Sequence, residues 1–504
     1  MTLISRIFGF LRDMVTAQLF GATAAFDAFS VAFRIPNLMR RLFAEGSFSQ
    51  AFVPVLSEYQ KNKSHEDAKQ FIDAVSGTLG FVLLCVTVLG ILFSPWIVRV
   101  FAPGFETDGA RFDMAVTMLR ITFPYLFLVS LTAFAGAVLN TYNRFWVAAF
   151  TPVFLNICMI ATAFWLSPRL HIPITSLAWG VLIAGIVQLF FQFPFLRRMH
   201  LMPRPKIRFH DAGVMRVLKL MVPALFGVSV SQVNLLLDTL FASLLVVGSV
   251  SWLYYSDRLM EFPLGVIGVA VSTVILPHLS RHHASEARED FSQTIDWALR
   301  LILLVGLPAG VVFAVISGPL LSTLFQHGHF DARAVMMSRQ SLSMFALGIA
   351  PFMLVKILAA GFYAKQDLRT PVRIGIIAMI SNMVLNVILI WPLKHAGIAL
   401  ATSLSAMLNG GLLFYFLSKR KIYVPREGWR YFSCRLLFAN TALAVFLWTA
   451  SGDMQEWVTQ SISWRVLHLS GLLISAVLLY FVGLWITGMR PRHVLIPTRL
   501  QSGS

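Results

Sequence analysis

The sequence predicts an all-α membrane protein in which fourteen helices cross the bilayer. Hydrophobic residues make up 57% of the 504-residue chain and charged residues only 13%, about half the charged share of soluble domains. The mean hydropathy is +0.74. Long runs without charge reach the length that a helix needs to cross about 30 Å of hydrocarbon. Basic residues concentrate in alternate loops, as in proteins that cross the membrane many times.

Nine of the expected helices follow from apolar runs alone. Eight runs without Asp, Glu, Lys or Arg have roughly the ~20 residues of a transmembrane helix. They cover residues 74–98, 121–143, 145–166, 172–196, 301–325, 374–393, 396–418 and 466–489. A ninth run, 436–452, is shorter and spans the membrane only together with its flanks.

Five further helices carry charges inside otherwise apolar segments. They are expected over residues 1–21, 25–59, 214–244, 249–280 and 338–363. The second of these is long and is expected to bend between Pro36 and Gly46, because proline frees backbone groups inside a helix. The total of fourteen is even, which places both chain ends on one side of the membrane.

The loop charges decide which side that is. Lys and Arg gather in loops 61–69, 197–208, 281–288, 365–373 and 419–430 and in the tail 490–499, whereas each loop of the opposite set holds one basic residue or none. This asymmetry predicts cytoplasmic basic loops and cytoplasmic termini. The net charge of +18 is therefore attributed to topology and to attraction for anionic lipids, and nucleic acid is not expected as a partner.

An internal repeat divides the chain. The segment 54–57 recurs as 277–280 and Ile72-Asp73 recurs as Ile295-Asp296, both at an offset of about 223 residues, and 101–105 resembles 325–330 one residue out of step. Duplication of a six-helix unit explains these matches. The predicted domains are an N-lobe over 1–200, a C-lobe over 201–420, and helices 13 and 14 with a cytoplasmic tail over 421–504.

Four arginines in membrane segments are the main functional clue. Arg6, Arg12, Arg40 and Arg258 lie in the first two helices of each half. A charge at the bilayer centre costs about 2.5–3.5 kcal/mol on insertion scales, so these side chains are expected to face an enclosed aqueous cavity between the halves. Because guanidinium stays charged and grips phosphate oxygens with two parallel hydrogen bonds, the cavity is predicted to bind a phosphorylated anion.

Further polar residues accompany these arginines as predicted gating groups or ion-pair partners. They are Asp13, Asp27, Arg34, Asn37, Arg41, Glu45, Asp257 and Glu261. Those of the second helix recur every three or four residues and share one helical face. The acidic members would pair with arginines when no substrate is bound and would latch the halves. The alternative is simple interhelical pairing or arginines reaching the head-group layer, which is favoured for Arg120 and Arg435.

Enzymatic and metal chemistry have no support in the sequence. There is no nucleotide-binding loop, nucleophile elbow or His-Glu-x-x-His motif, and no catalytic residue is predicted. The paired histidines at 282–283 and 327–329 lack matching ligands, so no metal site is expected. Cys85, Cys158 and Cys434 have no paired spacing and are interpreted as hydrophobic side chains. Asp238 is a candidate ligand for a coupling cation.

Three segments carry a resemblance to a known family. Residues 5–13, 36–46 and 255–263, supported by 50–54, 362–367 and 370–371, resemble the bacterial lipid II flippase family MurJ, also called MviN. The family belongs to the multidrug/oligosaccharidyl-lipid/polysaccharide exporter superfamily. The likeness extends over essentially the whole chain. Family members usually start further upstream, so the first helix is expected to be short here, or its start to lie before Met1, with Arg6 nearer the cytoplasmic face.

The resemblance implies a function. Such proteins have fourteen helices, a central cationic cavity and an apolar groove on helices 13 and 14 for the undecaprenyl tail. They move lipid II, the peptidoglycan precursor, to the periplasmic leaflet by alternating access during cell wall biogenesis, which also maintains cell shape. Arg6, Arg12, Arg40 and Arg258 match the family's arginines, and Asp27, Asp257 and Glu261 match its acidic partners. Expected partners are lipid II, membrane lipids and cell-wall synthesis proteins. No cofactor is expected, and coupling to membrane potential or a monovalent cation is left open.

Four other functions are the alternatives to lipid II transport. A flippase for another polyprenyl-diphosphate oligosaccharide would need the same cationic cavity and apolar groove. A drug exporter with cationic substrates would favour an acidic cavity. A membrane enzyme acting on polyprenyl diphosphate would need a metal-binding carboxylate cluster, which is not evident. A structural scaffold would gain nothing from buried arginines.

Overall fold

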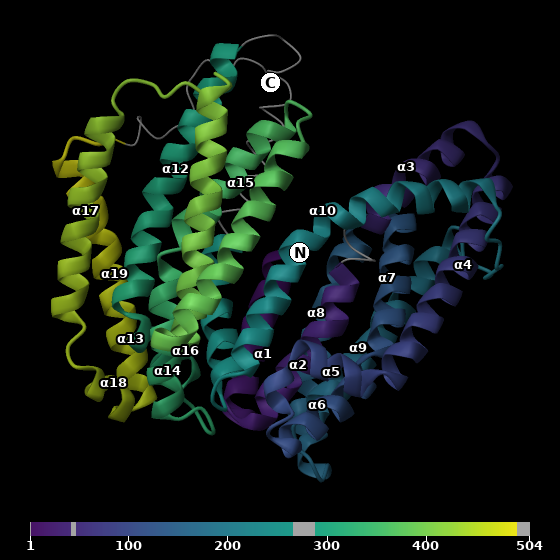
Figure 1. The fold of residues 1–504 in the computed structure, drawn as a ribbon, viewed down its shortest axis with the longest axis horizontal. Coiled ribbons are helices and arrows are strands. Elements are labelled where there is room, and N and C mark those ends of the chain that lie inside the picture. Colours follow the sequence, from purple (N-terminus) through teal and green to yellow (C-terminus); the bar gives the residue numbers. More distant parts are fainter. Residues whose placement is uncertain (1, 42–46, 266–287, 491–504) are drawn as a thin grey trace. The chain divides into compact units, whose positions relative to one another are not determined.

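The computed structural model describes residues 2–41, 47–265 and 288–490, and all regular elements in these ranges are helices (Figure 1). Nine helices in the described part of the chain are long and apolar enough to cross a membrane. The chain is therefore a multi-pass membrane protein, and its helix order is consistent with fourteen spans. It divides into two compact units, Met1–Ser251 and Trp252–Ser504, which are described separately below.

Ten α-helices lie entirely within the described part of unit 1. They are α1 (Thr2–Phe20), α2 (Ala24–Arg40), α3 (Ser47–Asn62), α4 (His65–Leu92), α5 (Ser94–Phe101), α6 (Gly109–Thr122), α7 (Pro124–Thr141), α8 (Phe145–Trp165), α9 (Thr175–Arg198) and α10 (Ala212–Ser243). A buried aromatic cluster joins α3, α4 and α7, where Phe52 stacks on Phe48 at 5.0 Å and on Phe71 at 5.6 Å between ring centroids. The long helix predicted over 25–59 is described as α2 and α3, on either side of residues 42–46, which lie outside the described residues.

Two predicted runs in unit 1 are each split into two helices. The run 74–98 divides at Phe93, and the run 121–143 divides at Phe123. Proline stands in the first turn of the second helix in both cases, as Pro95 in α5 and Pro124 in α7. Proline is favoured there because its missing N–H would have no partner inside the helix. Hydropathy detects the apolar run but not the break.

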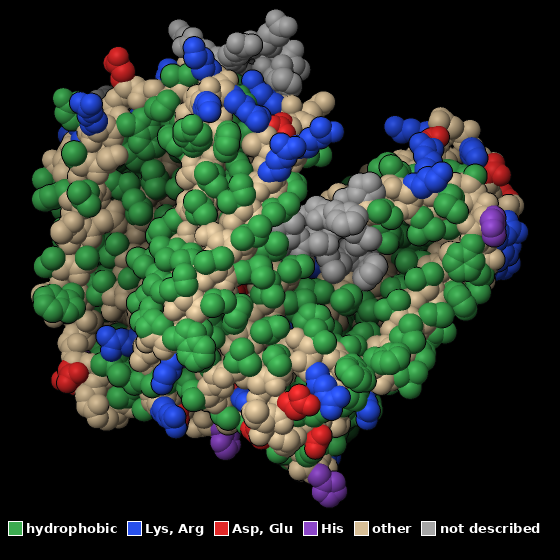
Figure 2. All heavy atoms as spheres, in the orientation of Figure 1, with side chains coloured by type: hydrophobic (Ala, Val, Ile, Leu, Met, Phe, Trp, Pro, Cys, Tyr) green, Lys and Arg blue, Asp and Glu red, His purple; other side chains and the backbone are tan. Residues whose placement is uncertain are grey.

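Residues 249–265 are helical, and most of this helix belongs to unit 2, which begins at Trp252. Its other helices are α12 (Arg288–Val315), α13 (Ser317–Phe325), α14 (Ala332–Ala346), α15 (Ile349–Tyr363), α16 (Arg369–Lys419), α17 (Trp429–Ala450), α18 (Met454–Thr459) and α19 (Ile462–Ile486). In Figure 2 the visible side of this unit is mostly hydrophobic, and Lys and Arg gather at the end where α12 begins and α16 ends. This distribution agrees with a membrane-embedded body and a charged surface at one end.

The element α16 contains both of the predicted helices over 374–393 and 396–418. Its helical conformation is interrupted at Lys394, which has φ 52° and ψ −130°. Just beyond it, Gly397 lies so close to the carbonyl of Leu389 that a Cβ atom would collide with that backbone. Glycine is therefore required at the point where the two helical segments meet.

The helix boundaries confirm the internal duplication. The break between α4 and α5 at Phe93 recurs between α12 and α13 at Ile316, an offset of about 223 residues. The junction of α6 and α7 near Phe123 likewise recurs between α14 and α15 near Leu347. Helices α17 to α19 follow the second copy. The lobe boundaries after residues 200 and 420 remain predictions, and the two compact units divide elsewhere, after Ser251.

The repeated aspartate of unit 1 anchors the segment that leaves α9. One carboxylate oxygen of Asp73, on α4, accepts a hydrogen bond from the backbone N–H of Arg204 at 2.8 Å. The carbonyl oxygen of Asp73 accepts the N–H of Lys206 at 3.0 Å. Lys69 pairs with the same carboxylate one turn away. Asp73 therefore ties this connecting segment to the first third of α4.

The matching aspartate of unit 2 does the same for the segment that leaves α16. Asp296, on α12, accepts hydrogen bonds from the Tyr423 hydroxyl and the Trp429 indole, both at 2.7 Å, and from the backbone N–H of Arg426 at 3.3 Å. Arg300 pairs with its second oxygen at 2.8 Å. Sequence comparison found these aspartates as a repeat match, but their anchoring role depends on contacts that only the structure reveals.

A buried arginine donates hydrogen bonds to the C-terminal end of α13. Arg465 of α19 is 8% exposed and donates to the carbonyl of Ser322 at 2.8 Å and to the side-chain oxygen of Gln326 at 3.0 Å. Replacing it with methionine should lower the free energy of unfolding by about 2 kcal/mol, because charge-assisted hydrogen bonds are lost and the carbonyl is left unpaired. Thermal unfolding in detergent measures this loss. The exposed Arg430→Met is the control, and equal melting of both variants would contradict the assignment.

Asp367 caps the start of α16 and predicts a pH effect. Burial raises its pKa, but hydrogen bonds from Thr370 and Arg420 outweigh burial and lower the pKa from 3.8 to about 2. Because the folded pKa is depressed, the stabilisation is complete above about pH 4 and is lost as pH falls towards 2. Asp367→Asn should cost about 1–2 kcal/mol at pH 7 after allowance for solvent screening. The difference between wild type and variant should shrink on acidification, whereas a pH-independent difference would refute the charge argument.

Candidate anion-binding site

The end of α2 presents Arg40 to a polar cavity in unit 1. The cavity has a volume of about 330 Å³ and is lined mainly by α7, α8 and α9. Its polar lining, besides Arg40, comprises Ser49, Tyr125, Thr132, Asn140, Thr151, Gln188 and Gln192. No carboxylate lines it among the described residues, so its electrostatic character is positive. A cavity of this kind favours an anionic group.

Neighbouring side chains hold the polar face of α2 in place. Arg40 donates from Nε to the side-chain oxygen of Asn37 at 2.9 Å. Arg34, almost two turns earlier, donates to the hydroxyl of Thr239 on α10. Arg41 is half-buried at the end of the helix. Glu45, the last predicted member of this face, lies outside the described residues.

A buried ion pair occupies α1. Arg12 and Asp13 are 6% and 3% exposed, and Arg12 donates to one Asp13 oxygen from Nη2 at 2.7 Å and from Nε at 3.1 Å. The remaining nitrogen, Nη1, lies 4.0 Å from the sulfur of Met159 on α8. Because Asp13 balances the guanidinium, an anion that binds Arg12 must compete with this carboxylate. Arg6, nearer the start of α1, is half-buried and forms no ion pair with a described residue.

Asp27 caps a helix from within the core of unit 1. It is fully buried and accepts the backbone N–H groups of Gly248 at 2.7 Å and Ser251 at 2.8 Å, together with the Ser251 hydroxyl. These donors belong to the start of the helical residues 249–265. Arg111 of α6 lies 3.6 Å away and balances the charge. Carboxylates are favoured at this position because they satisfy unpaired N–H groups.

Arg111 is a residue that sequence reasoning missed. It is 4% exposed, packs over the ring of Phe105 at 4.3 Å and approaches the carbonyl of Gly104 at 3.4 Å. The sequence places it in a weakly charged loop, and a solitary basic residue between apolar runs gives no sign that it is buried. Its pairing with Asp27 could have been suspected only from the need to balance that carboxylate.

Unit 2 contributes Arg258 and its neighbours. Arg258 pairs with Glu261 at 2.8 Å and lies over the ring of Tyr254 at 5.0 Å. The side chain of Arg258 is 26% exposed and that of Glu261 is 47% exposed, so this pair is more accessible than the Arg12–Asp13 pair. Asp257 is half-buried beside it. The meeting of these residues with the arginines of unit 1 in one cavity remains a prediction.

The described residues offer donors for an anion and no ligand set for a metal. No group of three or more His, Cys, Asp or Glu in this part of the chain is arranged to hold a metal ion. Cys85, Cys158 and Cys434 are free thiols. Guanidinium, amide and hydroxyl donors are the groups that bind phosphate oxygens in proteins, so the chemistry available is recognition of a phosphorylated group.

Comparison with known proteins identifies relatives over the whole length. A family model described as "Lipid II flippase MurJ" matches residues 16–468. A protein of Haemophilus influenzae named "Probable lipid II flippase MurJ" is 47% identical over 508 residues, covering 98% of this chain and 99% of the relative. The "Lipid II flippase MurJ" of Burkholderia cenocepacia is 41% identical, with 97% and 96% covered.

Solved structures agree with these matches. A structure titled "Lipid II flippase MurJ, inward closed conformation" superposes with a TM-score of 0.79 at 26% identity, covering 96% of each chain. An inward-facing multidrug resistance transporter of the MATE family and MOP superfamily has a TM-score of 0.69 at 12% identity, covering 83% of this chain and 94% of its own, which demonstrates a shared fold. The chain therefore belongs to the lipid II flippase family MurJ.

Proposed function

We propose that this protein is a flippase that moves lipid II from the cytoplasmic to the periplasmic leaflet of a bacterial inner membrane. The observation that carries the proposal is a polar cavity with Arg40 in its wall and no carboxylate among its described lining residues, in a chain of this family. The diphosphate of lipid II supplies the anion that such a cavity favours. The transported molecule is not chemically changed, so no catalytic residue is required.

The ion pairs suggest how the site would respond to substrate. Arg12–Asp13 and Arg258–Glu261 hold each guanidinium beside a carboxylate in this structure. A diphosphate carries more negative charge than a carboxylate and presents more acceptor oxygens. It would therefore displace these partners and bind to Arg6, Arg12, Arg40 and Arg258 together. Exchange of partners at residues of both units would link binding to alternating access.

The tail of the substrate needs an apolar path. Helices α17 and α19 pack through buried side chains such as Leu443 and Leu472. Their outer faces expose large apolar side chains, including Leu467, which is 71% exposed, and Phe481, which is 60% exposed. We infer that the undecaprenyl chain lies along these helices while the head group crosses. The basic loops support a topology in which both termini are cytoplasmic.

Reconstituted transport tests the proposal. Purified protein in liposomes that contain lipid II should make inner-leaflet lipid II accessible to an external probe, and protein-free liposomes should not. A polyprenyl-diphosphate carrying a different oligosaccharide is the comparison substrate. Transport of that lipid without transport of lipid II would replace the proposal with the alternative flippase, and transport of neither would refute both.

A further inference from the structure

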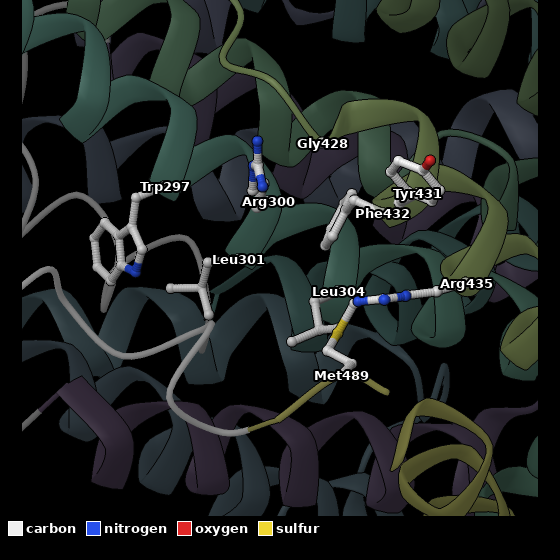
Figure 3. A pocket seen from close by; sticks show the side chains of 9 residues that line it. All are labelled: Trp297, Arg300, Leu301, Leu304, Gly428, Tyr431, Phe432, Arg435 and Met489. Atoms are coloured by element: carbon white, nitrogen blue, oxygen red, sulfur yellow. The ribbon is translucent and has the colours of Figure 1, made fainter. Parts of the chain in front are cut away.

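A second basic cavity lies in unit 2, away from Arg258. It has a volume of about 420 Å³ and is bounded by the middle of α12, the start of α17 and the segment just after α19. Figure 3 shows Arg435 reaching across it towards Leu304 and Met489, with Phe432 beside it and Arg300 above. The cavity therefore combines two guanidinium groups with an apolar wall.

The two arginines differ in how their charge is balanced. Arg300 pairs with Asp296 at 2.8 Å and donates to the carbonyl of Glu427 at 3.2 Å. Arg435 forms no ion pair with any residue that the structure describes. Residues 491–504 include Arg492 and Arg499 and no Asp or Glu. Among the described residues, the positive charge of Arg435 is therefore left for an external anion.

The start of α17 adds to this positive character. Gly428 is the N-cap of the helix and also lines the cavity, and it supplies no side chain to accept the first N–H groups. The N-terminal end of a helix carries unpaired N–H groups and roughly half a positive charge, which favour phosphate oxygens. The N-terminal end of α17 and the guanidinium of Arg435 therefore both make the same cavity positive.

The surroundings place the cavity at the level of lipid head groups. The basic loop 419–430 and Arg490 flank it. Tyr431 and Trp297 border it, and amphipathic aromatic side chains are typical of the membrane–water interface. Leu437, two residues after Arg435 on α17, is 69% exposed and provides apolar surface. These are the features of a site for a molecule with an anionic head and apolar chains.

We propose that this cavity binds the phosphate group of an anionic glycerophospholipid from the cytoplasmic leaflet, with Arg435 as its principal contact. The volume lies near the lower end of the usual range for small-ligand pockets, about 300–1,000 Å³, and suits a phosphoglycerol head. Phosphatidylglycerol leaves a net negative charge for Arg435. Phosphatidylcholine carries the same phosphate with a compensating ammonium group and should bind weakly.

Native mass spectrometry of the full-length protein tests the site. Wild type should retain phosphatidylglycerol in preference to phosphatidylcholine. Arg435→Gln should reduce retention about tenfold, because the charge-assisted contact is lost. The matched control is Arg430→Gln, which removes an exposed arginine of the same helix outside the cavity. Leu301→Trp fills the cavity without changing its charge and should also reduce retention, so the test does not depend on one variant folding.

Three results would overturn the proposal. The first is equal retention of phosphatidylglycerol by the Arg435→Gln and Arg430→Gln variants. The second is equal retention of the two phospholipids by wild type. The third is Arg435-dependent retention of undecaprenyl diphosphate without retention of phosphatidylglycerol. That result would make the cavity a binding site for the transported lipid. Failure of lipid II transport alone would leave this inference untouched, since the site needs no flipping activity.

Discussion

Replacing Arg12, Arg40 or Arg258 with alanine is expected to abolish rescue of cells depleted of their own lipid II flippase. Each guanidinium offers charge-assisted hydrogen bonds, and losing one such contact to a diphosphate costs about 1.5–3 kcal/mol, or roughly 10- to 150-fold in binding. Arg40 has the clearest structural basis because no carboxylate shares its cavity among the described residues. Growth of the depleted strain is the measurement, with membrane protein levels followed in parallel.

The controls separate charge from geometry. Arg120→Ala removes an exposed arginine that is expected to reach the head-group layer, and it should rescue growth fully. Lysine at positions 12, 40 and 258 should restore part of the activity if attraction of charge dominates, and little if paired hydrogen bonds to phosphate are needed. Full rescue by all three alanine variants would remove these arginines from the site.

Replacing Asp27 with alanine should destabilise unit 1 by about 3–5 kcal/mol, the usual cost of breaking a buried ion pair by removing one partner. The change leaves the buried Arg111 with only the more exposed Asp108 as an ion-pair partner, and it leaves the N–H groups of Gly248 and Ser251 without their acceptor. Asp27→Asn keeps the shape and one acceptor oxygen but not the charge, so it should fall between wild type and alanine. Thermal unfolding of the purified proteins measures the stability order of wild type, Asp27→Asn and Asp27→Ala.

A neighbouring carboxylate provides the comparison. Asp108 also lies 3.6 Å from Arg111, but its side chain is 39% exposed. Asp108→Asn should therefore change stability by less than about 1 kcal/mol. If the Asp108 and Asp27 variants unfolded at the same temperature, burial would not be the cause of the Asp27 effect.

The sequence was sufficient to predict the helical membrane fold and its duplication, because both depend on local features. Apolar run length places a span, and Ile72-Asp73 and Ile295-Asp296 mark equivalent positions. The breaks at Phe93 and Phe123 were missed, since hydropathy does not change across them although proline follows closely. The junction at Lys394 fell between two predicted runs and needed no connecting loop.

The candidate site could be predicted only in part, because the partners of its charged residues can lie far away in the sequence. Intramembrane charge singled out Arg12 and Arg258, and each lies beside a predicted acidic residue, Asp13 or Glu261. The role of these pairs in transport remains a prediction. The partners of Asp27 were beyond reach, because two of its bonds go to backbone N–H groups more than two hundred residues away. A backbone donor is present at every non-proline residue, so no sequence pattern distinguishes it.

The same property has a consequence for the aspartates at 73 and 296. Each binds the main chain of a connecting segment, at Arg204 and at Arg426. The side chains at these two positions are therefore free to vary without losing the bond, with one exception. Proline has no backbone hydrogen to donate, so it should be the single substitution at Arg204 or Arg426 that removes this backbone hydrogen bond.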